Sequence, residues 1–232
     1  MKNLLSESET VLLQACPLFA GIAPGELSAL LPGLQASVHG YAKGAYIYSA
    51  GAAAPALGVV LAGRVHVQQE DFWGARSIMG GFGPGQLFAE TYALLPAEPM
   101  AVSVLAVEES RVLFLDVHKM LAPGAVGGAL RARLVQNLLG VLARKNRMLT
   151  GKLTHMARRT TRQKLLSYLS AESLRQGSDS FRIPFDRQEL ADYLAVDRSA
   201  LSAELGRLRD AGVLRFAKDR FRLLRTDEIK EP

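Results

Sequence analysis

The residues whose types and spacing suit them best to chemistry lie in the segment DRQELADYLAVDRSALSAELGRLRDA, residues 186–211. Arg198, Ser199 and Ser202 fall in the first two turns of a helix that Asp197 can cap. An arginine can donate two parallel hydrogen bonds to guanine O6 and N7, and serine hydroxyls can bond base edges or phosphates. These side chains therefore offer hydrogen bonding to the edges of DNA bases rather than the making or breaking of covalent bonds.

The elements that must position these side chains are two short helices joined by a tight turn. Asp186 can cap the first helix, from which Leu190 and Leu194 would face inward, and Ala195 and Val196 make the turn. The second helix has its own buried stripe, which consists of Leu201, Leu205 and Leu208. This pattern predicts a helix-turn-helix, in which the amino-terminal turns of the second helix meet base edges in the major groove.

Two short runs after the second helix, residues 212–216 and 220–224, predict a two-stranded wing with basic residues at its tip. Residues 181–185, before the first helix, predict a further short strand. Contacts from basic and amide side chains to phosphates position a protein on DNA but carry no sequence information. The residues predicted to contact the DNA backbone are Arg187, Gln188, Arg207, Arg209, Lys218, Arg220 and Arg222.

The charge of the chain is divided unevenly along its length. Residues 1–127 contain 6 Lys and Arg against 10 Asp and Glu, a net charge of −4, whereas residues 128–232 contain 22 against 12, a net charge of +10. Such asymmetry points to a polyanionic partner for the basic half. Together with the helix-turn-helix and the wing, it predicts that the partner is double-stranded DNA.

A long helical pattern precedes the predicted helix-turn-helix. Steps of four and three residues from Val135 give a seam that is apolar except at Asn146, over about three heptads. A single asparagine in such a seam favours a two-stranded parallel coiled coil, so the pattern predicts a homodimer. The predicted dimer interface is Val135, Leu139, Leu142, Asn146, Leu149, Leu153 and Met156. A second apolar stripe can pack on the chain's own core and consists of Leu130, Leu134, Leu138 and Val141.

Residues 37–116 differ in composition from the helical segments. Short runs rich in β-branched and aromatic residues alternate with glycine or proline at intervals of about ten residues. This spacing predicts an antiparallel sandwich or barrel of short strands, and with the helices on either side the fold class is α+β. The predicted domains are 1–127, a β domain with amino-terminal helices, 128–157, the dimerisation helix, and 158–232, the winged helix-turn-helix.

Several other classes of protein are excluded by what the sequence lacks. Cys16 is the single cysteine, which excludes disulfides within the chain and a four-cysteine iron–sulfur cluster. We find no glycine-rich phosphate loop, metal-ligand cluster or nucleophile motif, and so expect no catalytic residues, no metal site and no enzymatic activity. The apolar stretches are too short for a membrane span and no signal peptide is recognisable, so we expect a cytoplasmic location.

The order of these parts resembles the Crp/Fnr superfamily of bacterial transcription regulators, the catabolite-activator-like proteins, over nearly the whole chain. The resemblance is carried by PLFAGI (17–22), YAKGAYIYSAG (41–51), GVVLAGRVHV (58–67), GPGQLFAE (83–90) and RQELADYLAVDRSALSAEL (187–205). It implies an amino-terminal double-stranded β-roll of the jelly-roll, cyclic-nucleotide-binding type, a homodimer on a palindromic operator, and contact with RNA polymerase. It also implies that a small effector in each roll shifts the dimer helices and hence the recognition helices.

The chain departs from the cyclic-AMP branch of this family inside the roll. In that branch a Gly-Glu pair and a later Arg-Ser pair hold the ribose and the cyclic phosphate. The matching positions here are Ala89-Glu90 and Met100-Ala101, so only Glu90 is kept. Because a phosphate without a charged partner is costly in a buried site, we do not expect cyclic AMP to bind.

Two interpretations of the roll stay open. The matching region is mostly apolar, which suits a small, largely apolar or aromatic effector with one polar handle. Alternatively, these residues fill the roll and there is no ligand. The candidate pocket residues are Leu87, Phe88, Ala89, Glu90, Tyr92, Met100 and Ala101, beside Leu149 and Thr150 of the dimer helix.

A haem-based gas or redox sensor of the same fold is a further alternative, since some branches of the family use haem. The candidate axial ligands are His39, His66, His118, His155 and Cys16. Of these, we interpret His155, near the dimer seam, and Cys16, before a proline, as structural.

Overall fold

The structure is a computed structural model that describes residues 4–70, 73, 76–122, 124 and 127–224, with only the backbone at 76 and 77. The chain divides into two compact units, Met1–Leu142 and Ala143–Pro232. The boundary falls inside α5 (Gly128–Met156), a helix of 29 residues. Within the described ranges, no helix is long and apolar enough to cross a membrane.

The first unit begins with short helices whose ends are set by local sequence signals. The Ser6 hydroxyl accepts a hydrogen bond from the backbone N–H of Glu9, and the Glu9 carboxylate accepts one from the backbone of Ser6. Pro24 starts α2, where its fixed φ suits the first helical turn. The helices of this unit are α1 (Glu7–Ala15), α2 (Pro24–Leu30), α3 (Glu90–Leu94) and α4 (Val117–Leu121), with 3-10 turns at Pro17–Phe19 and Pro32–Leu34.

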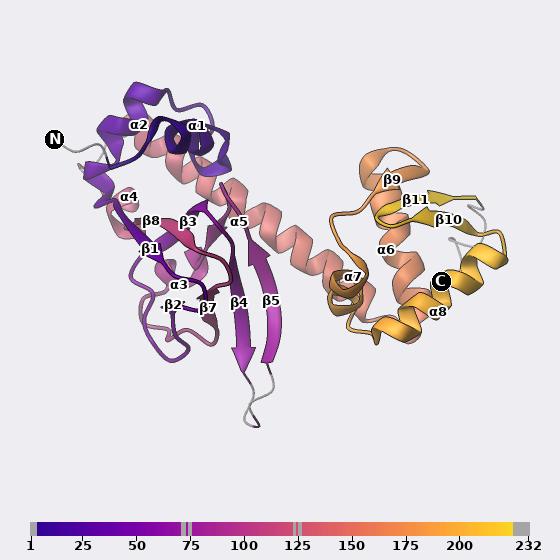
Figure 1. Cartoon of the computed structure of the whole chain (residues 1–232). Helices are drawn as coiled ribbons and strands as arrows, with labels where there is room; N and C mark the ends of the chain where they lie inside the picture. Colours follow the sequence, from indigo (N-terminus) through magenta and orange to yellow (C-terminus); the bar gives the residue numbers. More distant parts are fainter. Residues whose placement is uncertain (1–3, 71–72, 74–75, 123, 125–126, 225–232) are drawn as a thin grey trace. The chain divides into compact units, whose positions relative to one another are not determined.

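Two antiparallel four-stranded sheets form the predicted roll (Figure 1), and their strands follow α2, with α3 between β6 and β7 and α4 after β8. One sheet has the order β1-β8-β3-β6 and the other the order β2-β7-β4-β5. The strands are β1 (Ser37–Tyr41), β2 (Tyr46–Tyr48), β3 (Leu57–Ala62), β4 (Val65–Glu70), β5 (Arg76–Phe82), β6 (Leu87–Phe88), β7 (Ser103–Ala106) and β8 (Ser110–Leu115). The predicted α+β class with an antiparallel β domain is therefore confirmed.

The interior of the roll is filled by aromatic side chains. Phe88 and Phe114 are buried and meet edge to face with ring centroids 6.4 Å apart, and Tyr48 contacts both rings. Gly58 lies directly under Phe88, because a Cβ on this glycine would stand 2.2 Å from the ring. Only glycine therefore lets the ring pack this closely against β3.

A second core joins the amino-terminal helices to the outer side of one sheet and to the first half of α5. Leu134, Leu138 and Val141 are buried in it, as expected for the second apolar stripe. Asn137 Nδ2 donates hydrogen bonds to the carbonyls of Leu18 and Ala20, both at 2.9 Å. These contacts explain why the first unit extends to Leu142, whereas the sequence predicts a boundary between residues 127 and 128.

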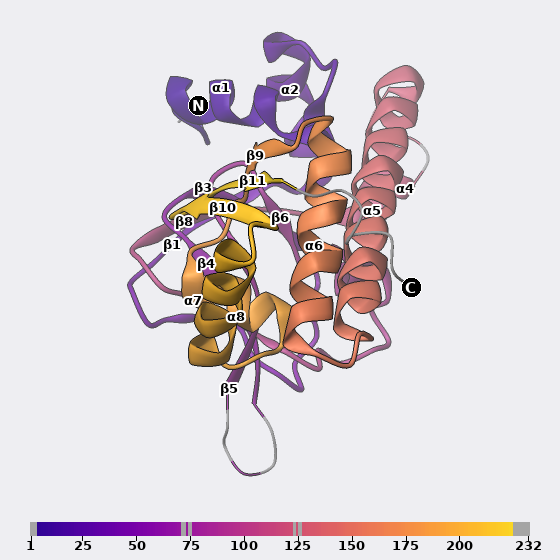
Figure 2. The ribbon, with the colours of Figure 1, turned by 90° about the vertical axis from the view of Figure 1, so that its right-hand side faces the viewer.

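The second unit packs helices against one face of an antiparallel sheet with the order β10-β11-β9 (Figure 2). Its core combines leucines of the three helices that follow α5 with Phe181 and Phe221 of the sheet. The elements are α6 (Thr161–Gln176), β9 (Ser180–Arg182), α7 (Arg187–Leu194), α8 (Arg198–Asp210), β10 (Leu214–Ala217) and β11 (Arg220–Leu223). This is the predicted winged helix-turn-helix, and β9, which overlaps the strand predicted at residues 181–185, pairs with β11 beside the two-stranded wing.

The predicted dimer seam of α5 is largely open to solvent. The leucines at 139, 149 and 153 are 61%, 57% and 66% exposed, respectively, and Asn146 is exposed between them. Val135 and Met156 are half-buried. Leu142 differs from the rest because it packs partly against the core of the first unit.

Candidate nucleic-acid interface

Hydrogen bonds fix both ends of the turn between α7 and α8. Ala195 adopts a left-handed conformation with φ +49°, and Lys164 Nζ donates to the carbonyls of Leu194 and Ala195 at 3.2 and 3.1 Å. Asp197 caps α8 by accepting hydrogen bonds from the N–H groups of Ser199 and Ala200. Asp197 also accepts a hydrogen bond from the Ser199 hydroxyl, which does most to lower the pKa of this carboxyl, and the two N–H groups lower it further.

The predicted base-contacting residues are exposed at the start of α8, and they differ in how free their polar atoms are. The Ser199 hydroxyl donates to Asp197 Oδ1 at 2.5 Å, and the Ser202 hydroxyl donates to the carbonyl of Arg198 at 2.9 Å. Both hydroxyls can therefore accept from a base without leaving the helix. The Arg198 guanidinium makes no ion pair with any described residue and stays available for a bidentate contact.

Arg207 and Arg209, two positions apart on α8, point to opposite sides of the helix. Arg207 Nη1 donates to Glu204 at 3.0 Å, and Arg162 of α6 approaches the other oxygen of Glu204 at 3.5 Å. Arg209 pairs with Asp210 at 2.9 Å. Glu204 is buried, so this cluster attaches α8 to α6 and directs Arg207 toward a carboxylate of its own chain.

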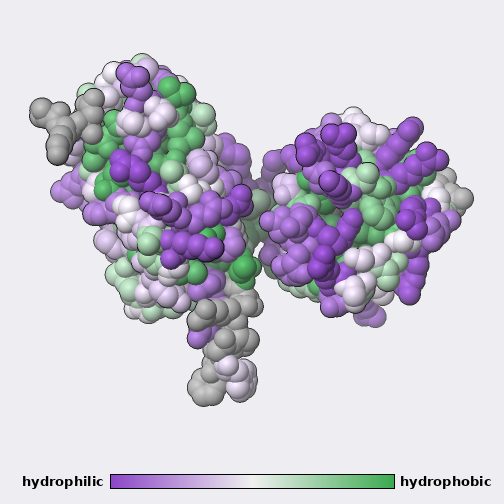
Figure 3. Space-filling model, viewed as in Figure 1, coloured by the Kyte–Doolittle hydropathy of each residue, from purple (hydrophilic) through white to green (hydrophobic). Residues whose placement is uncertain are grey.

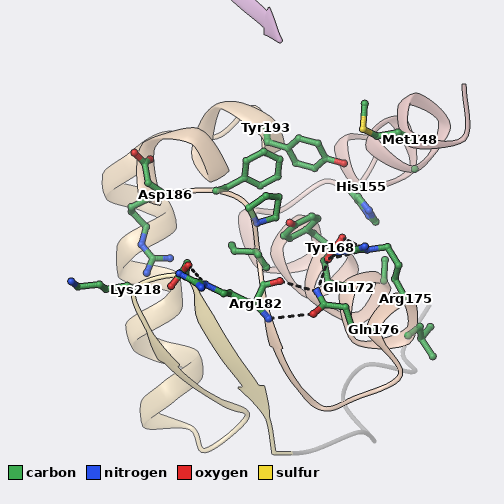
Figure 4. Close-up of a pocket in the computed structure, with 18 of the residues that line it drawn as sticks. Met148, His155, Tyr168, Glu172, Arg175, Gln176, Arg182, Asp186, Tyr193 and Lys218 are labelled. Atoms are coloured by element: carbon green, nitrogen blue, oxygen red, sulfur yellow. Dashed lines mark hydrogen bonds and ion pairs between the residues drawn. The ribbon is translucent and has the colours of Figure 1, made fainter. Parts of the chain in front are cut away.

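Several of the predicted contact residues share one concave surface of the second unit. Arg187, Gln188, Arg198 and Lys218 line a groove of about 2070 Å³ (Figure 4). Other cations along this groove come from the end of α5, from α6 and from β9, and they are Arg144, Arg147, Arg175 and Arg182. Three carboxylates also line the groove, and two of them form ion pairs, Glu172 with Arg175 and Asp219 with Arg182. The cations outnumber the carboxylates, so the groove has an excess of positive charge beside the amino terminus of α8, as a surface for phosphates requires.

The wall of the groove next to α5 is aromatic. Tyr193 lies 5.3 Å from the ring of Tyr168 and 4.8 Å from that of Phe185, and Lys152 Nζ stands 5.3 Å over Tyr193. Burial raises the pKa of Tyr168. Beside it, His155 Nδ1 is 2.9 Å from the Ser167 hydroxyl, and burial lowers the pKa of this histidine. These rings join the end of α5 to the helix-turn-helix, so the structural role predicted for His155 agrees with its packing.

The first residues of α7 are anchored by their neighbours. The guanidinium of Arg187 lies 5.1 Å over the ring of Phe216 on β10, and burial lowers the pKa of Arg187. Gln188 Nε2 donates to Asp192 at 2.9 Å. These contacts hold both side chains at the edge of the groove.

The wing brings together more arginines than the sequence pattern alone had predicted. Lys218 occupies the turn between β10 and β11 with φ +55°, and Arg220 and Arg222 follow on the exposed face of β11. Arg215 of β10 and Arg182 of β9 lie on the same face but were missed. A signal was present, because arginine and phenylalanine alternate in SFR, LRFA and RFRL, as expected for strands with one buried face.

The predicted pocket residues of the roll do not all face one space. Phe88 and Met100 are buried between the sheets, whereas Leu87 packs into the helical core because adjacent strand residues point to opposite faces. Glu90 is 4% exposed, and Tyr92 accepts a hydrogen bond from the Ala101 backbone at 3.3 Å. Ala89 takes a left-handed conformation with φ +60°. Leu149 and Thr150 belong to the second unit, so their place in this pocket stays a prediction.

Comparisons with protein families agree with this division of the chain. Residues 38–122 match the cyclic nucleotide-binding domain family, and residues 163–231 match the Crp-like helix-turn-helix domain family. No curated protein matches the chain.

Several solved structures are similar to the chain. CprK complexed with OCPA is 15% identical, with a TM-score of 0.65, over 87% of this chain and 92% of that one. A mutant of CooA from Carboxydothermus hydrogenoformans is 17% identical, with a TM-score of 0.59, over 87% and 88%. FixK2 from Bradyrhizobium japonicum is 20% identical, with a TM-score of 0.52, over 84% and 95%. These likenesses show the fold.

Proposed function

The chain belongs to the Crp/Fnr superfamily of DNA-binding transcription regulators, which are not enzymes, and we propose that it acts as a homodimer on a palindromic DNA site. The observation that carries the proposal is the amino-terminal turn of α8, which Asp197 caps. Arg198 is exposed in this turn and lines the basic groove. Contact with RNA polymerase is an expectation from the resemblance alone.

The open seam of α5 supports the homodimer. Soluble proteins rarely leave a regular row of leucines exposed along a helix, and a second copy of the seam would cover it. We expect Leu149→Glu together with Leu153→Glu to convert the dimer to monomer in sedimentation measurements. Leu174→Glu is the matched control, because Leu174 is 81% exposed on α6, away from the seam. A wild-type monomer, or a dimer that survives the double substitution, contradicts this part of the proposal.

The site preference of the full-length protein tests the DNA-binding function directly. Selection from a random duplex library is expected to yield a palindrome whose half-sites are about 10–10.5 base pairs apart, centre to centre. Arg198→Ala is expected to lose about 1–3 kcal/mol of discrimination at one base pair of each half-site. Arg209→Ala, about three turns further along α8, is expected to weaken binding to all sequences equally. Failure to enrich any sequence would refute the function.

The residues of the roll do not fit a cyclic nucleotide. Met100, at the position of the phosphate-binding arginine, is buried and apolar, and Phe88 and Phe114 occupy the space between the sheets. This packing supports a roll filled by its own side chains. We expect cyclic AMP to leave the melting temperature unchanged, and a clear rise would contradict this interpretation.

A small apolar effector is the second candidate for the roll, favoured by the carboxyl of Glu90, which is buried and could serve as the one polar handle. The haem alternative has less support. Cys16 is buried, and burial raises the pKa of its thiol, which disfavours the thiolate that binds iron. His39 lies 3.2 Å from the Ser37 hydroxyl and edge to face with Phe114. The absorption spectrum after incubation with haem is expected to show no Soret band, and a Soret band would restore the haem alternative.

A further inference from the structure

Lys164 lies in α6, outside the helix-turn-helix, but it is bonded to the turn inside that motif. Its Nζ atom donates hydrogen bonds to the carbonyls of Leu194 and Ala195, at 3.2 and 3.1 Å. Hydrophilic residues cover much of the visible surface of the second unit (Figure 3), whereas Lys164 is half-buried. Lys164 is also not among the described residues that line the groove beside α8. Its charge is therefore directed at the backbone of its own chain.

The carboxyl end of α7 lacks a cation of its own. The last four carbonyls of a helix have no partner inside that helix, and they form the negative end of its dipole. α7 has no basic residue in its last turn. Lys164 supplies the cation from α6, and a lysine beside the last carbonyls of a helix is stabilising.

The turn that accepts these hydrogen bonds is strained. Ala195 has φ +49° and ψ +60°, a left-handed conformation that at the end of a helix usually belongs to glycine. A strained residue keeps its conformation only where its surroundings determine it. Lys164 is such a constraint, because one of its two hydrogen bonds ends on Ala195 itself.

The strained turn leads directly into the base-reading end of α8. Ala195 is three residues before Arg198, and Asp197, the cap of α8, lies between them. A shift of the turn would therefore move the guanidinium that we propose to contact a base. Base recognition requires placement within about 0.5 Å and 10–20°, whereas a contact with phosphate carries no sequence information. A loose turn would thus reduce discrimination between sequences more than it reduces affinity for DNA.

A second contact from α6 reaches α8 further along the helix. Arg162 Nη1 lies 3.5 Å from an oxygen of Glu204, which is buried. α8 is thus joined to α6 at two points, before its first residue through Lys164 and in its second turn through Glu204. Along the chain, the contact made by Lys164 is the nearer of the two to Arg198.

From these contacts we propose that Lys164 is a positioning residue for base recognition. Without touching DNA, its ammonium group holds the turn at Ala195 against α6 and thereby sets the position from which Arg198 reads its base pair. The inference rests on the proposed DNA-binding function and adds to it a residue that determines specificity.

The test compares affinity for the selected site with affinity for unrelated duplex DNA at one salt concentration. Lys164→Met keeps an unbranched side chain and removes the ammonium group. In the full-length protein it is expected to lower the ratio of the two affinities by about fivefold or more, which corresponds to the lower limit of discrimination at one base pair. Lys164→Arg restores a cation that can bond the same carbonyls, and it is expected to recover most of the ratio.

Lys152→Met is the matched control. Lys152 is half-buried like Lys164, and it also contacts α7, since its Nζ atom lies 5.3 Å over the ring of Tyr193. The substitution removes the same charge and a contact with the same helix, but it leaves the turn at Ala195 in place. It is expected to keep the ratio of the two affinities, even where the melting temperature falls.

A double-mutant cycle tests whether Lys164 acts through Arg198. Lys164→Met is expected to reduce discrimination less in an Arg198→Ala background than in the wild type, because the side chain that it positions is already absent. The same cycle with Lys152→Met is expected to be additive. Additive losses for Lys164→Met would overturn the proposed route through Arg198.

Three further outcomes would overturn the proposal in different ways. A Lys164→Met variant with a lower melting temperature and an unchanged ratio would limit Lys164 to stabilising the fold. Equal losses on both kinds of DNA, with a salt slope lower by about 0.9, would mean that Lys164 itself contacts a phosphate. A Lys164→Arg variant that discriminates as poorly as Lys164→Met would show that the cation at the turn does not set specificity.

A variant that fails to fold does not end the test. If Lys164→Met does not fold, Lys164→Gln replaces it, because an amide can still donate to one carbonyl after the charge is removed. The ratio of affinities is then expected to fall in the same direction, and an unchanged ratio would refute the proposal. A wild type without any sequence preference would refute the proposed function as well.

Discussion

The roll and the wing are both built from short antiparallel strands, but they use the two faces of their sheets differently. In the roll, two sheets enclose Phe88, Phe114 and Met100, and the outer side of one is covered again by helices. In the wing, helices cover one face of the sheet, and the other face is left to Arg215 and Arg222. Apolar packing therefore stabilises both faces of a sheet in the first unit. In the second unit it stabilises one face of the sheet, and the other face carries charged side chains.

This contrast follows the division of charge along the chain. Residues 1–127 have a net charge of −4 and residues 128–232 a net charge of +10. Buried apolar contacts stabilise whether or not a partner is present, but opposed arginines become favourable only when an anion lies between them. We therefore expect substitutions in the roll to change stability most and substitutions in the wing to change binding most.

Phe88→Ala is expected to give the largest effect on stability. Removing this ring from the roll interior leaves a cavity and should lower the free energy of unfolding by about 3–5 kcal/mol. Urea unfolding followed by circular dichroism measures the change, and Phe88→Leu should lose less. A loss below about 1 kcal/mol would mean that the interior readjusts easily, which would favour the effector interpretation.

Glu204→Ala is expected to rank second. Glu204 is buried between Arg162 and Arg207, and its removal leaves their charges without the carboxylate, at about 1–3 kcal/mol of unfolding free energy. The same variant frees Arg207, so non-specific DNA affinity should rise while stability falls. Glu204→Gln keeps the shape of the side chain and separates packing from charge. A variant as stable as the wild type would show that the cluster does not attach α8 to α6.

Acid is expected to weaken the second unit through His155. Burial, and to a smaller extent Arg158, lowers the pKa of this histidine below 6.5, while Glu172 opposes the shift. The unfolded chain then binds the proton more readily, so stability is complete above the unfolded pKa and is lost as pH falls through the folded pKa. The free energy of unfolding between pH 7.5 and 5 should fall less in His155→Gln than in the wild type. An equal fall in the free energy of unfolding in both proteins would contradict the role given to His155.

Arg222→Thr is expected to give the smallest change in stability, and a change of opposite sign. It removes the repulsion with Arg215 and introduces a residue that favours strands, so the protein should gain about 0.2–1 kcal/mol at low salt. The gain should shrink at high salt, where screening already weakens the repulsion. Thermal unfolding at two salt concentrations measures both effects. A stability loss at low salt would show that the opposed arginines do not repel.

The helix-turn-helix could be predicted in detail because its signals are local. Asp186 and Asp197 cap their helices as the sequence indicated, and Leu201 and Leu205 are buried as their spacing requires. The roll strands were located by the same kind of pattern, for example Tyr46–Tyr48, which is β2.

Features that depend on distant parts of the chain could not be predicted in this way. Leu87 was assigned to the pocket with Phe88, but the direction of each side chain depends on the pairing of β6 with β3. Arg207 was assigned to phosphates, and nothing nearby in the sequence shows that Arg162 and Glu204 gather beside it. The pairing of Arg182 with Arg220 likewise needs the strand register.

The hydrogen bonds from Asn137 to the carbonyls of Leu18 and Ala20 have a consequence for how the protein is made. They join residues 119 and 117 positions apart, and Leu134 and Leu138 complete the same core. During synthesis, the amino-terminal helices therefore leave the ribosome long before the segment that covers them. A nascent chain that ends before α5 exposes their leucines, which makes it a substrate for chaperones. For the same reason, a truncated gene intended to express the roll alone has to extend through residue 142.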